Sequence, residues 1–197
     1  LSMVKDVLGS YSTSYSTSAA ARVANVENGT RLLNGVTLYP GETFSTLELV
    51  TPFTEANGYA MAGSYLNGLV VDSLGGGICQ VSTTLYNAVL FAELEVTQRS
   101  NHSMSVAYVP LSADAAIAES AGKDFCFTNS TDYPIYIEGY TTPERRVTFN
   151  IYGVETRKDG YTFNFVTEVM ETISATSENI IQVADQPIGY TKVQGAH

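Results

Sequence analysis

The chain has 197 residues, of which 44% are hydrophobic and 15% are charged, and it carries a net charge of -10. This composition provides enough apolar material for a folded core and too little charge for a disordered chain. Ten basic residues against twenty acidic ones argue against a nucleic-acid partner. No apolar run reaches the roughly 18 residues that indicate a membrane span. No signal peptide is visible, and we expect any anchor to lie outside these residues.

The N-terminal part begins with a repeated Tyr-Ser-Thr-Ser within residues 9–18. This repeat is either a linker or an edge strand on which Tyr11 and Tyr15 share a face. Ser18 is then placed to cap a helix that ends near Gly35. The predicted helix rests on residues that recur at spacings of three and four: Val23, Val26, Thr30 and Leu33.

The sequence pattern in the middle of the chain predicts a loop, a pair of strands and a buried helix. Pro40-Gly41 indicates a turn, and a loop follows to residue 58. Residues 59–71 are apolar and interrupted by glycine, which is typical of strands. Three glycines then lead into a segment with one apolar helical face, formed by Val81, Leu85, Val89 and Ala92.

The remainder of the sequence favours strands separated by polar turns. Residues 102–108 alternate between larger and smaller side chains up to Pro110. Further strands are predicted at residues 115–118, 125–128, 135–140, 147–152 and 161–169. The expected fold is α+β, mainly antiparallel sheet, with one buried helix carrying a cysteine at its N-terminus and a second, N-terminal helix. The expected division is a linker or edge segment at 1–17, a catalytic domain at 18–170 and an extension at 171–197.

Cys79 follows the glycine triplet and lies in the first turn of the predicted buried helix. The unpaired N–H groups of a helix N-terminus carry partial positive charge, which favours a thiolate. The N–H groups of Cys79 and Gln80 are placed to hold an oxyanion. Gly76 and Gly77 permit close approach of a substrate backbone. A lone cysteine in an apolar segment is more often a small core residue, and that alternative stays open here.

A thiolate enzyme needs a base, and His102 is the main candidate because the other histidine, His197, ends the chain. Asp114, across the turn at Pro110, is the first candidate to orient the imidazole, and Asp124 is the alternative. Each residue also has a structural interpretation: a core or surface histidine, and aspartates that cap turns.

The other polar and aromatic candidates are weaker. Cys126 lies between two phenylalanines in a predicted strand and is expected to be structural. Arg99, close to His102 in sequence, is either a ligand for a substrate carboxylate or a solvated arginine. Tyr108 is expected on the His102 face, where it walls a substrate groove. No residue spacing indicates a metal site or a cofactor.

Several motifs together resemble the VanW domain family. The most specific is GGGICQVSTTLYNA at residues 75–88, and the other matching stretches are 22–25, 33–35, 40–45, 99–103, 108–110, 114–116, 124–125 and 151–153. The resemblance covers about residues 11–153. The sequence departs from the family pattern at Ser112-Ala113, where the family tends to have a glycine before the aspartate.

The resemblance implies a surface protein of Gram-positive bacteria, and some VanW domains are regarded as L,D-transpeptidases. It implies Cys79 as nucleophile and His102 as its base, acting on peptidoglycan stem peptides without a cofactor to form 3-3 cross-links. A cell-wall cysteine peptidase or carboxypeptidase using water, and a non-catalytic wall-binding module, remain alternatives. Residues 186–195 are similar to the lead-in of a G5 module. We expect an extracellular monomer, and the acceptor amine stays open.

Overall fold

The computed structural model describes residues 4–66, 69–158, 161, 164–173, 180, 187 and 190. The fold within them is α+β and mainly antiparallel, as the sequence predicts. The helices are α1 (Ala20–Leu33), α2 (Thr46–Val50) and α3 (Ile78–Phe91), with 3-10 turns at Glu55–Asn57 and Glu119–Ala121. The strands are β1 (Asp6–Ser14), β2 (Thr37–Leu38), β3 (Thr43–Ser45), β4 (Met61–Leu66), β5 (Leu69–Leu74), β6 (Glu95–Gln98), β7 (Cys126–Thr128), β8 (Ile135–Thr141) and β9 (Arg146–Gly153).

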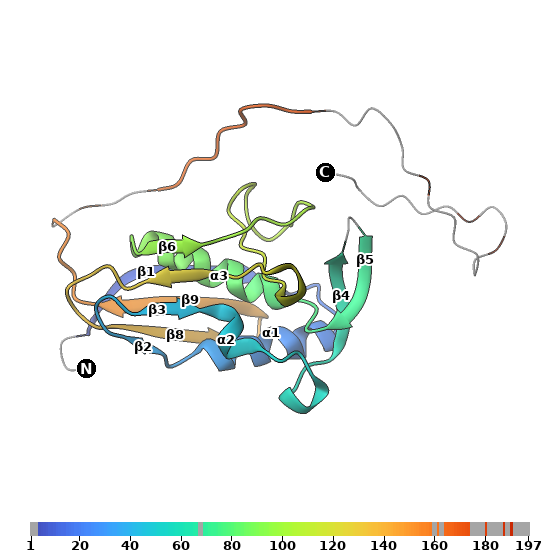
Figure 1. The fold of residues 1–197 in the computed structure, drawn as a ribbon, viewed down its shortest axis with the longest axis horizontal. Coiled ribbons are helices and arrows are strands. Elements are labelled where there is room, and N and C mark those ends of the chain that lie inside the picture. The colour runs from blue at the N-terminus through green and yellow to red at the C-terminus, as the bar shows by residue number, and fades with distance from the viewer. Residues whose placement is uncertain are drawn as a thin grey trace.

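The strands form three antiparallel sheets. The largest has the strand order β1-β9-β8-β2, the second has the order β3-β7-β6, and β4 and β5 form a separate hairpin. Figure 1 shows the hairpin at one end of the molecule, beyond the four-stranded sheet. The turn that enters α3 is bonded to this hairpin, because Gly75 N–H donates to the carbonyl oxygen of Ala60 just before β4. The hairpin and the N-terminus of α3 therefore lie together.

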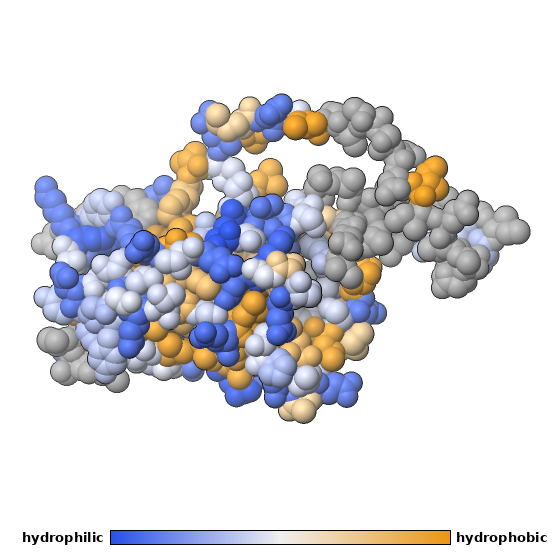
Figure 2. Space-filling view, in the orientation of Figure 1, coloured by the Kyte–Doolittle hydropathy of each residue, from blue (hydrophilic) through white to orange (hydrophobic). Residues whose placement is uncertain are grey.

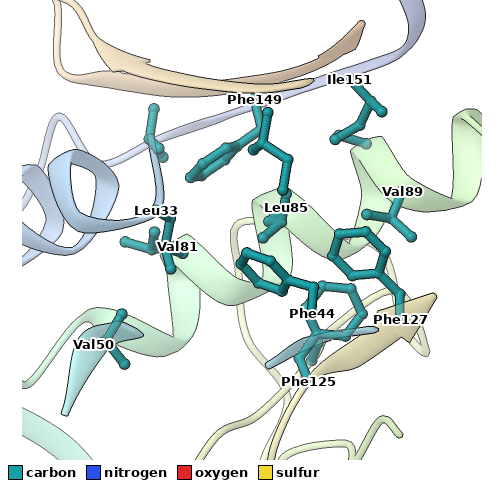
Figure 3. Close-up of a cluster of buried hydrophobic side chains, with 14 of the residues drawn as sticks. Leu33, Phe44, Val50, Val81, Leu85, Val89, Phe125, Phe127, Phe149 and Ile151 are labelled. Carbon is teal, nitrogen blue, oxygen red and sulfur yellow. The ribbon is translucent and has the colours of Figure 1, made fainter. Parts of the chain in front are cut away.

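The hydrophobic core is built on both sides of α3, which explains why most residues of this helix are buried. Figure 3 shows β9 on one side of the helix and the phenylalanines of β3 and β7 on the other. The fully buried side chains on these faces are Leu85 of α3, Phe149 and Ile151 of β9, and Phe125 and Phe127 around the start of β7. Burying side chains of this size stabilises the fold by roughly 1.5–3 kcal/mol each.

The first copy of the Tyr-Ser-Thr-Ser repeat, residues 11–14, lies in β1, the edge strand of the four-stranded sheet, and is not a linker. This strand pairs with β9 over its length, with a register shift between Val7 and Gly9. A Cβ atom at Gly9 would lie 2.2 Å from the Ala88 carbonyl oxygen, so this glycine lets β1 pass close to α3. Tyr15 lies beyond the end of the strand and is buried.

The first helix is confirmed as α1, but the predicted cap is wrong. The residue at the cap position is Ala19, without a capping side chain, and Ser18 accepts a hydrogen bond from the Arg22 guanidinium instead. The region after Pro40, predicted to be a loop, in fact contains β3 and α2. Ser45 caps α2 by accepting a hydrogen bond from the backbone N–H of Glu48.

Two predicted strands are wrong, and a third is wrong where it is described. Residues 102–108 form turns and bends, and residues 115–118 are extended with a single bridge at Ala118. The backbone N–H groups of His102 and Ala115 donate to the Asp114 carboxylate and the Thr83 hydroxyl, so side chains take part of the role that a strand ladder would have. The described residues of the predicted strand at 161–169 form no strand, and residues 162 and 163 lie outside the described residues.

The surface seen in Figure 2 is largely polar, with apolar residues scattered between charged ones. Residues 164–173 lead away from the sheets (Figure 1), and several of their apolar side chains are exposed: Val166, Val169, Met170 and Ile173. Within the described part of the chain, no helix is long and apolar enough to cross a membrane. Of the segment similar to a G5 lead-in, all but Pro187 and Tyr190 lies outside the described residues.

Candidate active site

The glycine turn before α3 is shaped by contacts with its own chain. Gly77 occupies the cap position with a φ of 106°, a left-handed conformation that favours glycine. A Cβ atom on Gly76 would lie 2.2 Å from the carbonyl oxygen of Ala62 in β4. The buried Asn25 amide of α1 donates to the carbonyl oxygens of both Gly76 and Ala60, each at 2.9 Å. Asn25 therefore fixes the position at which α3 begins.

Cys79 is the second residue of α3 and is partly buried. Its thiol donates a hydrogen bond to the Ile117 carbonyl oxygen at 3.4 Å. This location agrees with the predicted first turn, where the helix dipole favours an anion. The thiol is therefore held at a helix N-terminus by the segment of residues 113–117, which contains Asp114.

The segment of residues 113–117 is bound to α3 by polar residues of the helix. Ser82 donates to the Ala115 carbonyl oxygen at 2.6 Å, and Thr83 accepts from the Ala115 N–H at 3.0 Å. The Asn87 amide donates to the Ala113 carbonyl oxygen at 2.8 Å. These three buried polar side chains replace strand partners, which explains why a core helix contains them.

Gln80 has a structural contact as well. Its side chain is buried, and its amide donates to the Thr13 hydroxyl and the Ser14 carbonyl oxygen at the end of β1. Its backbone N–H donates to the Gly77 carbonyl oxygen at 3.0 Å. Of the two N–H groups considered for an oxyanion, the Gln80 group thus already has an acceptor, and the Cys79 group is the better candidate.

His102 and Asp114 form a close pair. The Asp114 Oδ2 atom lies 2.6 Å from the His102 Nδ1 atom and accepts the backbone N–H of His102 at 2.7 Å. Both side chains are largely buried, with relative exposures of 7% for His102 and 11% for Asp114. Because Nδ1 faces Asp114, Nε2 is the ring nitrogen left to face the thiol.

The protonation of this pair follows from these contacts. Burial lowers the pKa of His102, but its hydrogen bonds to Asp114 and Cys79, together with their charges, raise the pKa to about 9. For Asp114, burial favours the neutral acid, whereas hydrogen bonds from His102 and the charges of His102 and Arg99 shift its pKa below the ordinary value. The geometry therefore stabilises an imidazolium between a carboxylate and a sulfur.

Arg99 holds Asp114 from the other side. Its guanidinium donates to the Asp114 carbonyl and carboxylate oxygens at 2.7 and 3.1 Å, and to the Ser112 carbonyl oxygen at 2.9 Å. It also lies over the ring of Tyr86. Arg99 is therefore placed to fix the Asp114 loop, and its binding of a substrate carboxylate stays a prediction.

Two tyrosines border the site. Tyr65 of the β4–β5 hairpin lies edge-on to the His102 ring, with ring centroids 6.0 Å apart, and is 43% exposed. Burial and the neighbouring Cys79 raise the pKa of Tyr108, while a hydrogen bond with Thr83 works in the opposite direction. Tyr108 thus lies near Cys79, although on a turn and not on the predicted strand.

The sequence-based reasoning missed Arg22 of α1. Its half-buried guanidinium interacts electrostatically with Tyr108, Tyr65 and Cys79. An arginine on the polar side of an amphipathic helix is usually a solvated residue, and only the crossing of α1 beside the α3 N-terminus brings it to the thiol. The residue stands in the RVAN stretch at 22–25, one of the motifs singled out in the sequence, but no signal there indicated its position.

Asp124, the alternative partner of His102, is used elsewhere. Its carboxylate accepts hydrogen bonds from the Ser45 hydroxyl at 2.6 Å and from the Leu47 N–H at 3.0 Å at the start of α2. It also accepts from the Cys126 thiol at 3.2 Å. Burial and this carboxylate raise the pKa of Cys126 to about 12. The structure thus separates Asp124 and Cys126 from the Cys79 site.

Comparison with known proteins shows which family the chain belongs to. The model of the family described as VanW like protein matches residues 21–152, which contain Cys79, His102 and Asp114. The chain belongs to the VanW family. No solved structure matches it.

Two curated relatives match this VanW-family chain. One is the "Uncharacterized protein YoaR" of Bacillus subtilis, 39% identical over 130 residues. The other is the "Vancomycin B-type resistance protein VanW" of Enterococcus faecalis, 33% identical over 123 residues. The alignments cover 66% and 59% of this chain but only 43% and 44% of the relatives. The chain therefore spans less than half the length of these relatives.

Proposed function

We propose that this VanW-family domain is a cysteine acyltransferase that acts on peptidoglycan stem peptides outside the cell, as an L,D-transpeptidase. The observation that carries the proposal is the His102–Asp114 pair beside a thiol at the N-terminus of α3. A nucleophile, a base and a group that orients the base are the components of covalent acyl transfer. The printed name of the Enterococcus relative, a vancomycin resistance protein, supports a cell-wall substrate.

In the first half of the proposed reaction, the Cys79 thiolate attacks the carbonyl carbon of the third stem residue. The developing oxyanion accepts a hydrogen bond from the Cys79 N–H. When the intermediate collapses, the bond from that carbon to the nitrogen of the terminal D-residue breaks. The leaving amine takes its proton from the His102 imidazolium, and a thioester remains on Cys79.

In the second half, an amine of a neighbouring stem attacks the thioester carbonyl. His102, now neutral, accepts the proton of the attacking amine, and the Cys79 sulfur leaves as the new amide forms. The product is a cross-link between third residues. Asp114 remains ionised throughout, and it holds the imidazole in the tautomer that presents Nε2 to the sulfur.

Water in place of the amine would give a carboxypeptidase with the same residues. Transfer requires that water be excluded while a second stem is bound. Tyr65 and Tyr108 flank the thiol and His102, and their rings are suited to limiting the access of water from those two sides. We therefore favour transfer over hydrolysis.

The test is to incubate the purified domain with a disaccharide tetrapeptide and to analyse the products by mass spectrometry. The proposal expects dimers joined from position three to position three, which Cys79→Ala abolishes and Cys126→Ala leaves unchanged. Tripeptide without dimers would instead establish a carboxypeptidase. Unchanged substrate, together with retention of the protein on glycan strands, would establish a binding module and contradict the proposal.

A further inference from the structure

The side chain of Arg22 crosses the glycine turn that precedes the nucleophile. A Cβ atom on Gly77 would lie 2.8 Å from the Arg22 Cγ atom and 3.3 Å from its Nε atom. Gly77 is two residues before Cys79 and forms the cap of α3. The absence of a side chain at Gly77 therefore leaves the space that Arg22 occupies beside the first turn of the helix.

The Arg22 guanidinium has open hydrogen-bond capacity. Its Nη1 atom donates to the Ser18 hydroxyl at 2.7 Å. Among the described residues, the ion pairs involve Arg99, His102 and Arg157 as cations and do not include Arg22. An arginine that is half-buried without a carboxylate is unusual, because a guanidinium presents five donors that suit a bidentate carboxylate.

The groups that face Arg22 are those of the candidate site. Burial lowers the pKa of this guanidinium, and the hydroxyls of Tyr108 and Tyr65 and the Cys79 thiol act in the opposite direction. Burial raises the pKa of Tyr108, so this phenol is neutral near pH 7. The guanidinium thus lies beside the nucleophile, and no carboxylate of the described residues forms an ion pair with it.

We propose that Arg22 binds the free carboxylate of the terminal residue of the donor stem, so that the enzyme selects peptides ending one residue after the attacked carbonyl. This inference rests on the proposed function and names the donor's recognition group. Consecutive Cα atoms are about 3.8 Å apart, so such a peptide places its carboxylate and its reactive carbonyl within one residue of each other. The Arg22 side chain and Cys79 likewise both lie at the first turn of α3.

The negative net charge of the protein is a further reason to expect a cation that binds the substrate carboxylate. The chain has a net charge of -10, which repels a carboxylate substrate at long range. Arg99 is occupied by Asp114 and Ser112, so it offers less to a substrate than the sequence suggested. A half-buried cation beside the thiol supplies local attraction where the substrate must bind.

The experiment measures binding, so that it does not depend on turnover. The protein carries Cys79→Ala, and its Kd is measured by calorimetry for a stem tetrapeptide with a terminal carboxylate and for the same peptide with a terminal amide. We expect the carboxylate form to bind at least tenfold more tightly. When Arg22→Gln is combined with Cys79→Ala, the ratio of the two Kd values should fall below twofold. Arg22→Lys should keep part of the preference for the carboxylate.

Arg31→Gln is the matched control, because Arg31 lies in the last turn of the same helix and is exposed. It should retain the full preference. A preference that survives Arg22→Gln, an equal Kd for both peptides, or binding of neither peptide would overturn the inference. If Arg22→Gln does not fold, an unchanged preference in Arg22→Lys and Arg22→Met would overturn it equally. A clear carboxylate preference without any thioester on the wild-type enzyme would contradict the proposed function alone.

Discussion

One oxygen atom of Asp114 holds His102 at two points. Its Oδ2 atom accepts the backbone N–H of His102 and lies 2.6 Å from the ring Nδ1 atom. Since the backbone and the ring are fixed by the same carboxylate, the imidazole has little freedom to rotate. The arrangement makes Asp114 a positioning residue as well as the counter-charge of the imidazolium.

Asp114→Asn is expected to lower the rate of cross-linking roughly 10²- to 10⁴-fold, because the ring loses the charged acceptor that fixes its tautomer. The rate of dimer formation measures this effect, and thermal unfolding checks that the fold is retained. Asp124→Asn is the matched control. It disturbs the cap of α2 and should lower the melting temperature while leaving the rate per folded molecule unchanged. Equal rates for Asp114→Asn and the wild type would remove Asp114 from the mechanism.

The stability of the fold should depend on the charge of His102. Its pKa rises from 6.5 to about 9 on folding, so the imidazolium is favoured in the folded state. This contribution is complete below pH 6.5 and is lost as the pH rises through about 9. It is up to about 3 kcal/mol.

The check is the free energy of unfolding by urea at pH 6.5, 8 and 10, for the wild type and for His102→Gln. The wild type should lose more stability than the variant between pH 8 and pH 10. Titrating groups that do not contact His102 affect both proteins alike. Parallel pH dependence of the two proteins would show that the His102 ring is not charged in the folded state.

Cys79 should react with iodoacetamide well before Cys126 in the folded protein. Cys79 is partly exposed at a helix N-terminus beside His102, whereas burial and Asp124 raise the pKa of Cys126 to about 12. Peptide mass spectrometry after a short reaction near pH 7.5 measures the two rates, and we expect a ratio of at least ten. His102→Gln should reduce the ratio. Equal labelling of the two cysteines would count against a reactive Cys79.

Ser112→Gly should stabilise the protein by up to about 1 kcal/mol, because Ser112 has a φ of 66°, where a side chain costs about 1–2 kcal/mol. The greater freedom of glycine in the unfolded chain offsets about 0.5–1 kcal/mol of this gain. The substitution restores a glycine near the position at which the VanW pattern has one. Ser103→Gly in the same exposed stretch is the control, since Ser103 does not have a positive φ, and it should be neutral or destabilising. A loss of stability for Ser112→Gly would show that its hydroxyl outweighs the strain.

The sequence was sufficient to predict α3, the position of Cys79 in its first turn and the strands β8 and β9. Each of these depends on local pattern: glycines, an apolar helical face, or alternation with polar turns. It failed at residues 102–108, where the alternation is real but no partner strand lies alongside. There the backbone N–H of His102 donates to the Asp114 carboxylate and not to a neighbouring strand.

The parts of the site that depend on tertiary contacts could not be predicted from local sequence patterns. Arg22 and Asn25 belong to α1, and their relation to the glycine turn depends on how α1 crosses α3. The choice between Asp114 and Asp124 was open for the same reason, since both follow His102 in sequence. Only the folded chain shows that Asp124 faces α2 while Asp114 faces the imidazole.

The most direct test of the account is the intact mass of the protein after brief incubation with a disaccharide tetrapeptide and quenching in acid. The account predicts an added mass equal to the donor without its terminal amino acid. Peptide mapping should place the acyl group on Cys79 as a thioester that hydroxylamine removes, with none on Cys79→Ala and a normal amount on Cys126→Ala. An unchanged mass while cross-linked product still forms, or an acyl group on any other residue, would contradict Cys79 as the nucleophile.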